Sequence, residues 1–106
     1  MRAKLRCQVS PGQFSSECAV VIRAASGREY SLFTERSTVS VGQWPQDDQS
    51  VDGWIDVDLV EERGSTPNGS LVLVRLPQTT LENGQYLTVS RGQLDVPRIQ
   101  TQAISA

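Results

Sequence analysis

Histidine is absent from this chain of 106 residues, and its absence narrows the available chemistry more than any residue present. The most common general base and the most common metal ligand of proteins are both missing, so Ser-His-Asp and Cys-His catalytic groups are excluded. Catalysis would have to use carboxylates, tyrosine, cysteine or Lys4, the only lysine. We therefore expect no enzymatic activity. The enzymatic alternative is a carboxylate-based hydrolase, which would need two acidic side chains in one pocket.

Long apolar runs, glycine-rich phosphate loops and an excess of positive charge are also lacking. The N-terminal segment has basic residues but no continuous apolar stretch behind them, so it predicts neither a signal peptide nor a membrane-spanning helix. The eight glycines are scattered at turn positions instead of clustering before a helix. A net charge of -2 gives no general attraction to phosphate backbones. These absences predict a cytoplasmic protein that binds neither nucleic acid nor membranes and holds no cofactor or metal.

What the sequence does contain is a series of short runs with the two-residue period of β-strands. From Ala3 to Val9, the apolar residues Leu5, Cys7 and Val9 alternate with polar ones. The run 54–62 alternates in the same way, with acidic residues on its wet side. Further strand candidates are residues 17–25, 28–34, 38–41, 71–76 and 86–89.

This pattern predicts one antiparallel all-β domain that spans residues 1–106. Glycine, proline and asparagine turn signals separate the runs, and the hydrophobic residues, 38% of the chain, are spread along it. The commonest strand lengths imply about six to eight short strands, arranged as a small sandwich or a partly open barrel. Residues 95–106 form a C-terminal extension, which we expect to add an edge strand or to contact a partner.

The segments around Ser26-Gly27 predict a β-hairpin with apolar residues on both faces. A two-residue turn there would place Val20 opposite Phe33 on one face and Val21 opposite Leu32 on the other. One face would cover the domain core, and the other would need a second layer or a partner subunit. These four residues are therefore the candidate interface.

Three further local predictions concern turns and the edge of the core. Asn83-Gly84 is the strongest turn signal in the chain and would pair Leu81 with Tyr86 in a second hairpin. Residues 63–70 are rich in turn formers and are expected to be a loop. Phe14 is expected to cover the edge of the core.

Cys7 and Cys18 are the only cysteines. If the first two strand candidates pair through the loop 10–16, these two residues face each other on the core side. One interpretation is a pair of buried thiols that act as small hydrophobic side chains. A disulfide is the alternative, and it would stabilise the fold by about 2–3 kcal/mol in the chain-entropy model. Two cysteines without histidine do not predict a zinc site.

Trp44 and Trp54 bracket the longest polar loop, which also carries Asp47, Asp48 and Asp52. An exposed indole beside carboxylates is a common way to bind a sugar, because the ring covers its apolar face while polar groups take its hydroxyls. Loop carboxylates are also ligands that calcium prefers, although no EF-hand spacing is present. The competing interpretations are a core or interface tryptophan and a solvated acidic face.

The leading functional hypothesis is a non-catalytic binding or assembly module. It would associate with itself or with a protein partner through a strand edge or through the second apolar face of the hairpin. The alternative is a carbohydrate or small-ligand binding domain that uses Trp44, Trp54 and the acidic loop, with or without calcium.

Overall fold

A computed structural model describes residues 1–67, 69–82 and 84–96 of the chain. Nearly all the regular structure in these residues is β-strand, with two short 3-10 helices and no α-helix. The strands are β1 (Arg2–Pro11), β2 (Glu17–Arg23), β3 (Glu29–Glu35), β4 (Val39–Val41), β5 (Val51–Thr66), β6 (Gly69–Arg75), β7 (Tyr86–Ser90) and β8 (Leu94–Asp95). The 3-10 helices η1 (Arg36–Thr38) and η2 (Arg91–Gln93) precede β4 and β8.

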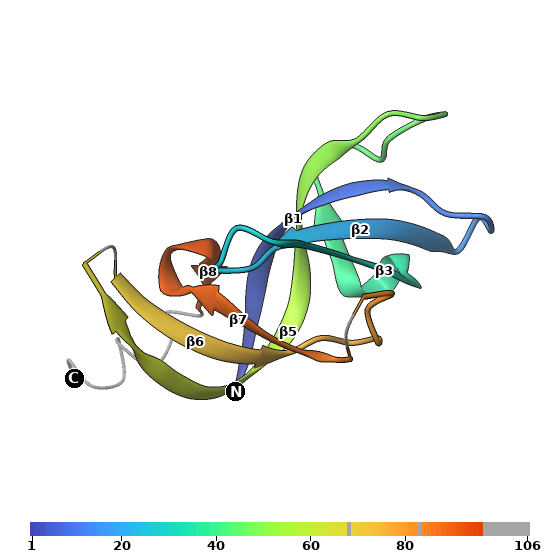
Figure 1. The fold of residues 1–106 in the computed structure, drawn as a ribbon. Helices are drawn as coiled ribbons and strands as arrows, with labels where there is room; N and C mark the ends of the chain where they lie inside the picture. The colour runs from blue at the N-terminus through green and yellow to red at the C-terminus, as the bar shows by residue number, and fades with distance from the viewer. Residues whose placement is uncertain (68, 83, 97–106) are drawn as a thin grey trace, which may run out of the picture.

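All eight strands belong to one antiparallel sheet that curls into a half-barrel (Figure 1). The order of the main path is β3-β2-β1-β5-β6-β7, while β4 pairs with β5 and β8 pairs with β1. The all-β prediction is confirmed, and of its two alternatives the structure is the partly open barrel. A sandwich would need two sheets, whereas here the twist of one sheet encloses the core.

The core lies on the concave side of the sheet, where alternate residues of the strands converge. Leu5 and Val9 of β1, Ile22 of β2 and Ile55 of β5 are fully buried. These side chains belong to a single apolar cluster to which seven of the strands, the β2–β3 turn and the β6–β7 connection contribute. The alternation predicted for residues 3–9 is confirmed, and the one predicted for residues 54–62 holds as far as Leu59, beyond which residues 60–62 are all exposed.

Gly53 marks the closest approach between strands. It lies on β5 between β1 and β4, where it pairs with Cys7 on one side and Val41 on the other. A Cβ atom at this position would lie 2.7 Å from a methyl carbon of Val41 and 2.9 Å from one of Val9. Only glycine leaves room for these side chains to meet above the strand.

The β2–β3 hairpin forms, but its predicted register is wrong by one residue. Val20 lies opposite Leu32 instead of Phe33. The reason is a longer turn, in which Gly27 adopts a φ of 91° and its N–H donates to the carbonyl of Ala24 at 2.9 Å. A glycine with positive φ is typical of a three-residue turn, and the extra residue shifts all later pairs.

The pairing of β1 with β2 also differs from the prediction. β1 continues to Pro11, which lies opposite Cys18, so the register is displaced by four residues from the one that joined Cys7 to Cys18. Both cysteines are buried free thiols. The disulfide alternative is therefore wrong for this structure, and the interpretation as small hydrophobic side chains is confirmed.

One predicted loop and one predicted hairpin are also corrected. Residues 63–70 are mostly strand, because β5 extends to Thr66 and β6 begins at Gly69, with two register shifts in β5. The β6–β7 connection is long, and Tyr86 lies opposite Arg75 instead of Leu81. Asn83 itself lies outside the described residues. Each shift leaves one extra residue on β5, as a β-bulge does, and such bulges bend a strand locally.

The strands at the two ends of the main path, β3 and β7, are linked to each other by groups outside the sheet. The N–H of Ala25 donates to the carbonyl of Thr88 at 3.0 Å, and the N–H of Leu81 donates to the carbonyl of Ser31 at 2.8 Å. The Glu82 carboxylate accepts from the Ser31 N–H at 2.7 Å and from its hydroxyl at 2.9 Å. Both edges are thus partly blocked, which limits pairing with another chain.

The C-terminal extension supplies one short strand to its own sheet. Leu94 pairs with Leu5, and Asp95 pairs with Lys4, so β8 lies beside β1 as an edge strand. Residues 97–106, which hold most of the predicted extension, lie outside the described residues. In the described part of the chain, no helix has the length and apolar character needed to cross a membrane.

Candidate functional site

The convex face of β1 and β5 carries four cross-strand pairs that we call the charge ladder. Its rows are Arg2–Asp58, Lys4–Asp56, Arg6–Trp54 and Gln8–Asp52. The Lys4 ammonium lies 3.2 Å from Asp56, and the Arg6 guanidinium lies 5.7 Å from the centre of the Trp54 ring. Gln8 donates a hydrogen bond to Asp52. Every acidic residue of the ladder thus has a basic or amide partner from β1.

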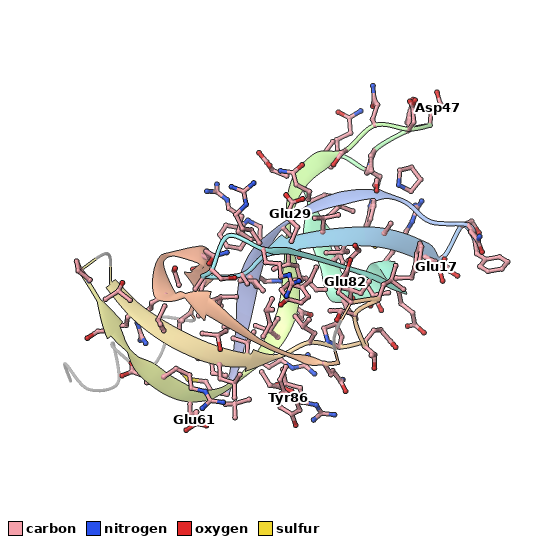
Figure 2. All side chains as sticks on the ribbon, viewed as in Figure 1. Glu17, Glu29, Asp47, Glu61, Glu82 and Tyr86 are labelled. Carbon is pink, nitrogen blue, oxygen red and sulfur yellow. The ribbon has the colours of Figure 1, made fainter. Side chains whose placement is uncertain are left out.

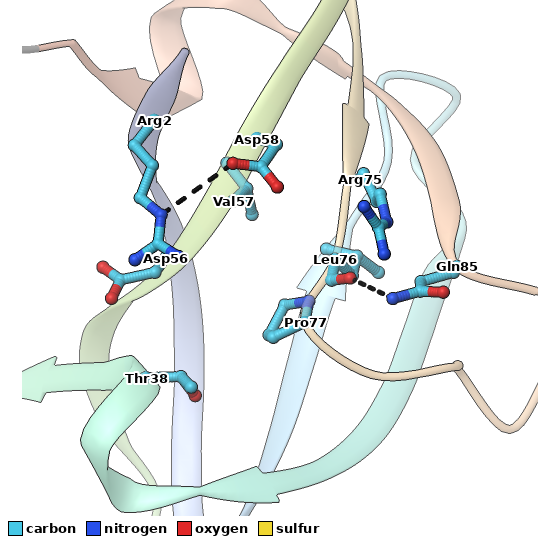
Figure 3. A pocket seen from close by; sticks show the side chains of 9 residues that line it. All are labelled: Arg2, Thr38, Asp56, Val57, Asp58, Arg75, Leu76, Pro77 and Gln85. Carbon is cyan, nitrogen blue, oxygen red and sulfur yellow. Dashed lines mark hydrogen bonds and ion pairs between the residues drawn. The ribbon is translucent and has the colours of Figure 1, made fainter.

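One end of the charge ladder forms a hollow that holds two carboxylates. Asp56 and Asp58 line it together with Arg2, Arg75 and the segment around Leu76. Its volume is about 140 Å³, and the Arg2 guanidinium lies between the two carboxylates (Figure 3). Each carboxylate has a cationic neighbour, and the hollow is smaller than ordinary ligand pockets.

Trp54 lies beside a second hollow, of about 180 Å³, at the junction of β1, β4 and β5. Asp52, Arg6 and Ser40 contribute polar groups to the same hollow. The indole is only half buried, and the Arg6 guanidinium lies over its ring. The structure therefore places two of the five predicted ligand-binding residues, Trp54 and Asp52, in one small hollow.

The other three predicted ligand-binding residues lie elsewhere. Trp44 packs partly against the core, and the Arg36 guanidinium carbon lies 4.7 Å from the centre of its ring. Asp47 and Asp48 lie in an exposed turn closed by a 3.0 Å bond from the Gln49 N–H to the Gln46 carbonyl (Figure 2 labels Asp47). Among the described residues, no group of three or more acidic or cysteine side chains is arranged to hold a metal ion.

Burial controls the chemistry of the two cysteines. It raises the pKa of Cys7 to about 12, with smaller contributions from the nearby Cys18 and Asp52. Burial also raises the pKa of Cys18, and Arg36 partly opposes this effect. A thiol that stays protonated at neutral pH is a poor nucleophile and a poor metal ligand. These residues are therefore packing groups.

The predicted interface residues divide between the core and the surface. Val20 and Leu32 are fully buried on the concave side, so they cannot contact a partner. Val21 is partly exposed, and Phe33 is 43% exposed on the convex side. The one-residue shift of register separates these pairs, since it moves Leu32 to the core side and Phe33 to the outer side.

Phe33 belongs to an exposed group at the end of the β2–β3 hairpin that is farthest from its turn. A hollow of about 340 Å³ is lined there by Phe14, Glu17, Phe33 and Glu35, a group that we call the phenylalanine face, and by neighbouring polar residues. Phe14 is 67% exposed, so the prediction that it covers the core edge is wrong. The sequence analysis missed Phe14, Glu17 and Glu35 because they converge only once the registers of β1, β2 and β3 are known.

The loop between β1 and β2 fixes the position of Phe14. The Glu17 N–H donates to the Phe14 carbonyl at 3.0 Å, and the Gly12 N–H donates to the Glu17 carbonyl at 3.3 Å. These bonds turn the chain at the end of the sheet, where Glu17 begins β2 (Figure 2). Phe14 is thus held at the surface by backbone bonds, not by packing of its ring.

Glu17 and Glu35 lie directly opposite each other on neighbouring strands. Glu17 accepts a 3.3 Å bond from the Gln13 N–H, and Glu35 accepts a 3.4 Å bond from the Ser37 hydroxyl. Neither carboxylate forms an ion pair with any residue that the structure describes. Like charges at directly opposite positions destabilise a sheet.

Comparison with protein-family models, with curated protein sequences and with solved structures finds no match to this chain.

Proposed function

We propose that this chain is a non-catalytic binding module that contacts a protein partner through the phenylalanine face. The observation that carries the proposal is the exposure of two phenylalanines around one hollow, Phe14 at 67% and Phe33 at 43%. Aromatic residues are enriched at protein interfaces, and exposed apolar side chains that cluster around a hollow are typical of binding surfaces.

The state of the sheet edges favours a face over an edge as the binding surface. Ser31, near the middle of β3, already bonds to Leu81 and Glu82, and Thr88 of β7 already accepts from Ala25. A strand from another chain would have to displace these bonds before it could pair. The convex side of the hairpin end, in contrast, can be contacted without breaking any bond of the chain.

The charges of the phenylalanine face also bear on self-association. A symmetric dimer through this face would bring Glu17 and Glu35 of both subunits together, which adds like-charge repulsion to the contact. A different partner avoids this cost. We therefore favour a heterotypic partner over the symmetric self-association that the sequence suggested.

The partners of the polar groups support the non-catalytic part of the proposal. The two carboxylates that share a hollow, Asp56 and Asp58, lie beside Lys4 and Arg2. Burial keeps the pKa of both thiols high, and Lys4 donates to Ser40 as well as to Asp56. The groups most able to act as nucleophile or base are therefore buried or engaged.

Selection of peptides from a random displayed library tests this proposal without assuming what the partner is. We expect enriched peptides whose binding is lost in the Phe33→Ser variant and retained in Val60→Ser, which removes an equally exposed apolar side chain elsewhere. Binders that Phe33→Ser leaves unchanged, or no binders at all, would contradict the proposal. Light scattering after size-exclusion chromatography tests self-association separately, and a dimer that Phe33→Ser dissociates would favour a second copy as the partner.

A second candidate function is carbohydrate binding beside Trp54. The observation in its favour is the single hollow that Trp54 shares with Asp52, Ser40 and Arg6. Titration of a panel of soluble glycans should change the Trp54 fluorescence, and the Trp44→Phe variant isolates that signal. No response in this variant would remove the candidate.

A further inference from the structure

The convex side of the β2–β3 hairpin shows an internal contrast in charge. At the turn end, Arg23 lies opposite Glu29, and their charged groups are 3.4 Å apart. At the other end, Glu17 lies opposite Glu35, and no described basic side chain pairs with either. The charged side chains at the turn end of the hairpin therefore neutralise each other, whereas the two carboxylates at the other end have no cationic partner in the described chain.

The chain itself shows which group would satisfy the unpaired end. Arg6 lies over Trp54, and Arg36 lies over Trp44, so cations on aromatic rings occur twice in the structure. Arg6 also shares its hollow with the Asp52 carboxylate. The hollow of the phenylalanine face offers the same combination of aromatic rings and carboxylates, but no cation of the described chain occupies it.

We infer that the hollow of the phenylalanine face binds a cationic side chain, arginine or lysine, of a partner protein. The cation would lie between the carboxylates of Glu17 and Glu35, while its apolar stem packs against Phe14 and Phe33. A volume of about 340 Å³ accommodates one such side chain with part of its backbone. This inference rests on the proposed function and adds the chemistry of the partner to it.

The proposed contact also gives the facing carboxylates of Glu17 and Glu35 a role in binding. A cation that binds between Glu17 and Glu35 removes their mutual repulsion. Because the free protein carries this repulsion and the complex does not, its relief adds to the favourable free energy of binding. Replacing one carboxylate should then act in opposite directions on stability and on binding. A pair with a purely structural role would not show this opposition.

A titration followed by amide chemical shifts tests the inference with two matched peptides. The probes are acetyl-leucyl-arginyl-leucinamide and its citrulline analogue, which has nearly the same shape but no charge. We expect the arginine peptide to shift the amide signals of Phe14, Glu17, Phe33 and Glu35, and to bind roughly tenfold more tightly than the citrulline peptide, as one charge-assisted contact predicts. The preference should weaken as salt is added.

Variants of the acidic residues complete the test. Glu35→Gln should raise the melting temperature by about 1–4 °C, because a like-charge pair is removed, and should weaken the arginine peptide roughly tenfold. The matched control is Asp48→Asn, which neutralises an exposed carboxylate in the turn before β5 and should change neither quantity. Calcium chloride alone serves as a further probe of the carboxylates.

Several outcomes would overturn the inference. Equal binding of the two peptides would show that the hollow does not select a cation. It would still show an apolar binding face, so the proposed function would survive. A fall in melting temperature in Glu35→Gln would show that the carboxylate has a stabilising role. Saturable binding of calcium that Glu35→Gln abolishes would assign the hollow to a metal ion. Library peptides that depend on Phe33 but carry no basic residue would contradict the inference alone.

Discussion

The charge ladder and the phenylalanine face lie on the same convex side of one sheet, yet they treat charge in opposite ways. In the ladder, β1 presents a basic or amide side chain to each acidic residue of β5, as in Lys4–Asp56. In the phenylalanine face, Glu17 meets Glu35. Acidic residues on a strand are therefore uninformative until their cross-strand neighbours are known, because pairing decides whether they stabilise the sheet or remain available to a ligand.

The aromatic residues of the two surfaces differ in the same way, in whether they have partners within the chain. Trp54 in the ladder lies under Arg6 and beside β4, so much of its ring is in contact with its own chain. Phe14 and Phe33 have large exposed fractions and line a hollow. Where the charged groups and aromatic rings of a surface have partners within the chain, we expect a structural role. Where they do not, we expect a partner.

The largest expected effect on stability comes from a substitution at Gly53, which lies on β5 within the charge ladder and packs closely against its neighbours. Gly53→Ala places a methyl group 2.7 Å from Val41 and 2.9 Å from Val9, so we expect a loss of about 2–3 kcal/mol in the free energy of unfolding. Urea unfolding measures this change. The matched control is Gly42→Ala, because a Cβ atom there meets no neighbour within 4 Å. Equal stability of the two variants would show that β1, β4 and β5 are not packed as described.

Alkaline pH is expected to lower the stability of the fold through the buried core, by way of the Cys7 thiol. The folded protein holds Cys7 at a pKa of about 12, whereas the unfolded chain ionises near the ordinary value of about 8.5. A raised pKa contributes stability that is complete below pH 8.5 and is lost as the pH rises towards 12. Between pH 8 and pH 10, Cys7 should account for a loss of about 2 kcal/mol.

Cys7→Ala is the variant that isolates this effect. Its stability should fall less steeply between pH 8 and pH 10 than that of the parent, because the group that ionises on unfolding has been removed. Identical slopes would show that the Cys7 thiol is not held protonated by burial. Reaction of the native protein with a thiol reagent at neutral pH should be slow for the same reason.

Reversing one charge in a row of the ladder should create a like-charge pair similar to Glu17 and Glu35. Lys4→Glu places a carboxylate opposite Asp56, and we expect a loss of about 1 kcal/mol, since both side chains are partly exposed. Thermal unfolding at low and high salt measures it, and the loss should shrink at high salt. Lys4→Gln is the control that removes the pair without repulsion. If the two variants are equally stable, the row is not electrostatically coupled.

The smallest effect is expected at the border of the phenylalanine face, where Glu82 bonds to Ser31. These hydrogen bonds, first from the backbone N–H and then from the hydroxyl, hold the pKa of Glu82 below its ordinary value. A lowered pKa contributes stability that is present above the ordinary value and is lost as the pH falls through the folded-state pKa. Glu82→Gln should therefore be less sensitive to acid than the parent, and amide exchange at Ser31 should be faster in it. Unchanged exchange at Ser31 would contradict the bond.

How much of this fold the sequence predicts depends on the length scale. Alternation over residues 3–9 and 54–62 identifies β1 and much of β5, because side chains on a strand point to opposite faces in turn. Turn chemistry is less reliable. Ser26-Gly27 indicates a hairpin correctly, but Gly27 occupies the third position of the turn, and that single residue places Leu32 instead of Phe33 opposite the buried Val20.

The candidate site depends on a longer scale still. Glu17 and Glu35 are eighteen positions apart by their numbers, and Phe14 lies in a loop that reads as a polar connection. Their convergence requires the registers of β1 with β2 and of β2 with β3, and hydrophobic patterning constrains such registers only through the buried face. Of the acidic loop and its tryptophans, conspicuous in the sequence, Asp52 and Trp54 share a hollow while the other three residues lie elsewhere.

By itself, the sequence determined the all-β class, the inward and outward sides of the clearest strands, and the lack of histidine-based chemistry. These properties depend on residue types and on the two-residue period of a strand, which are local. Tertiary structure alone decided that the sheet curls into a half-barrel, that Cys7 and Cys18 are not cross-strand partners, and that two phenylalanines share a hollow with two carboxylates. The physical reason is that pairing register and strand curvature are collective outcomes of core packing and turn geometry, to which each residue contributes only in part.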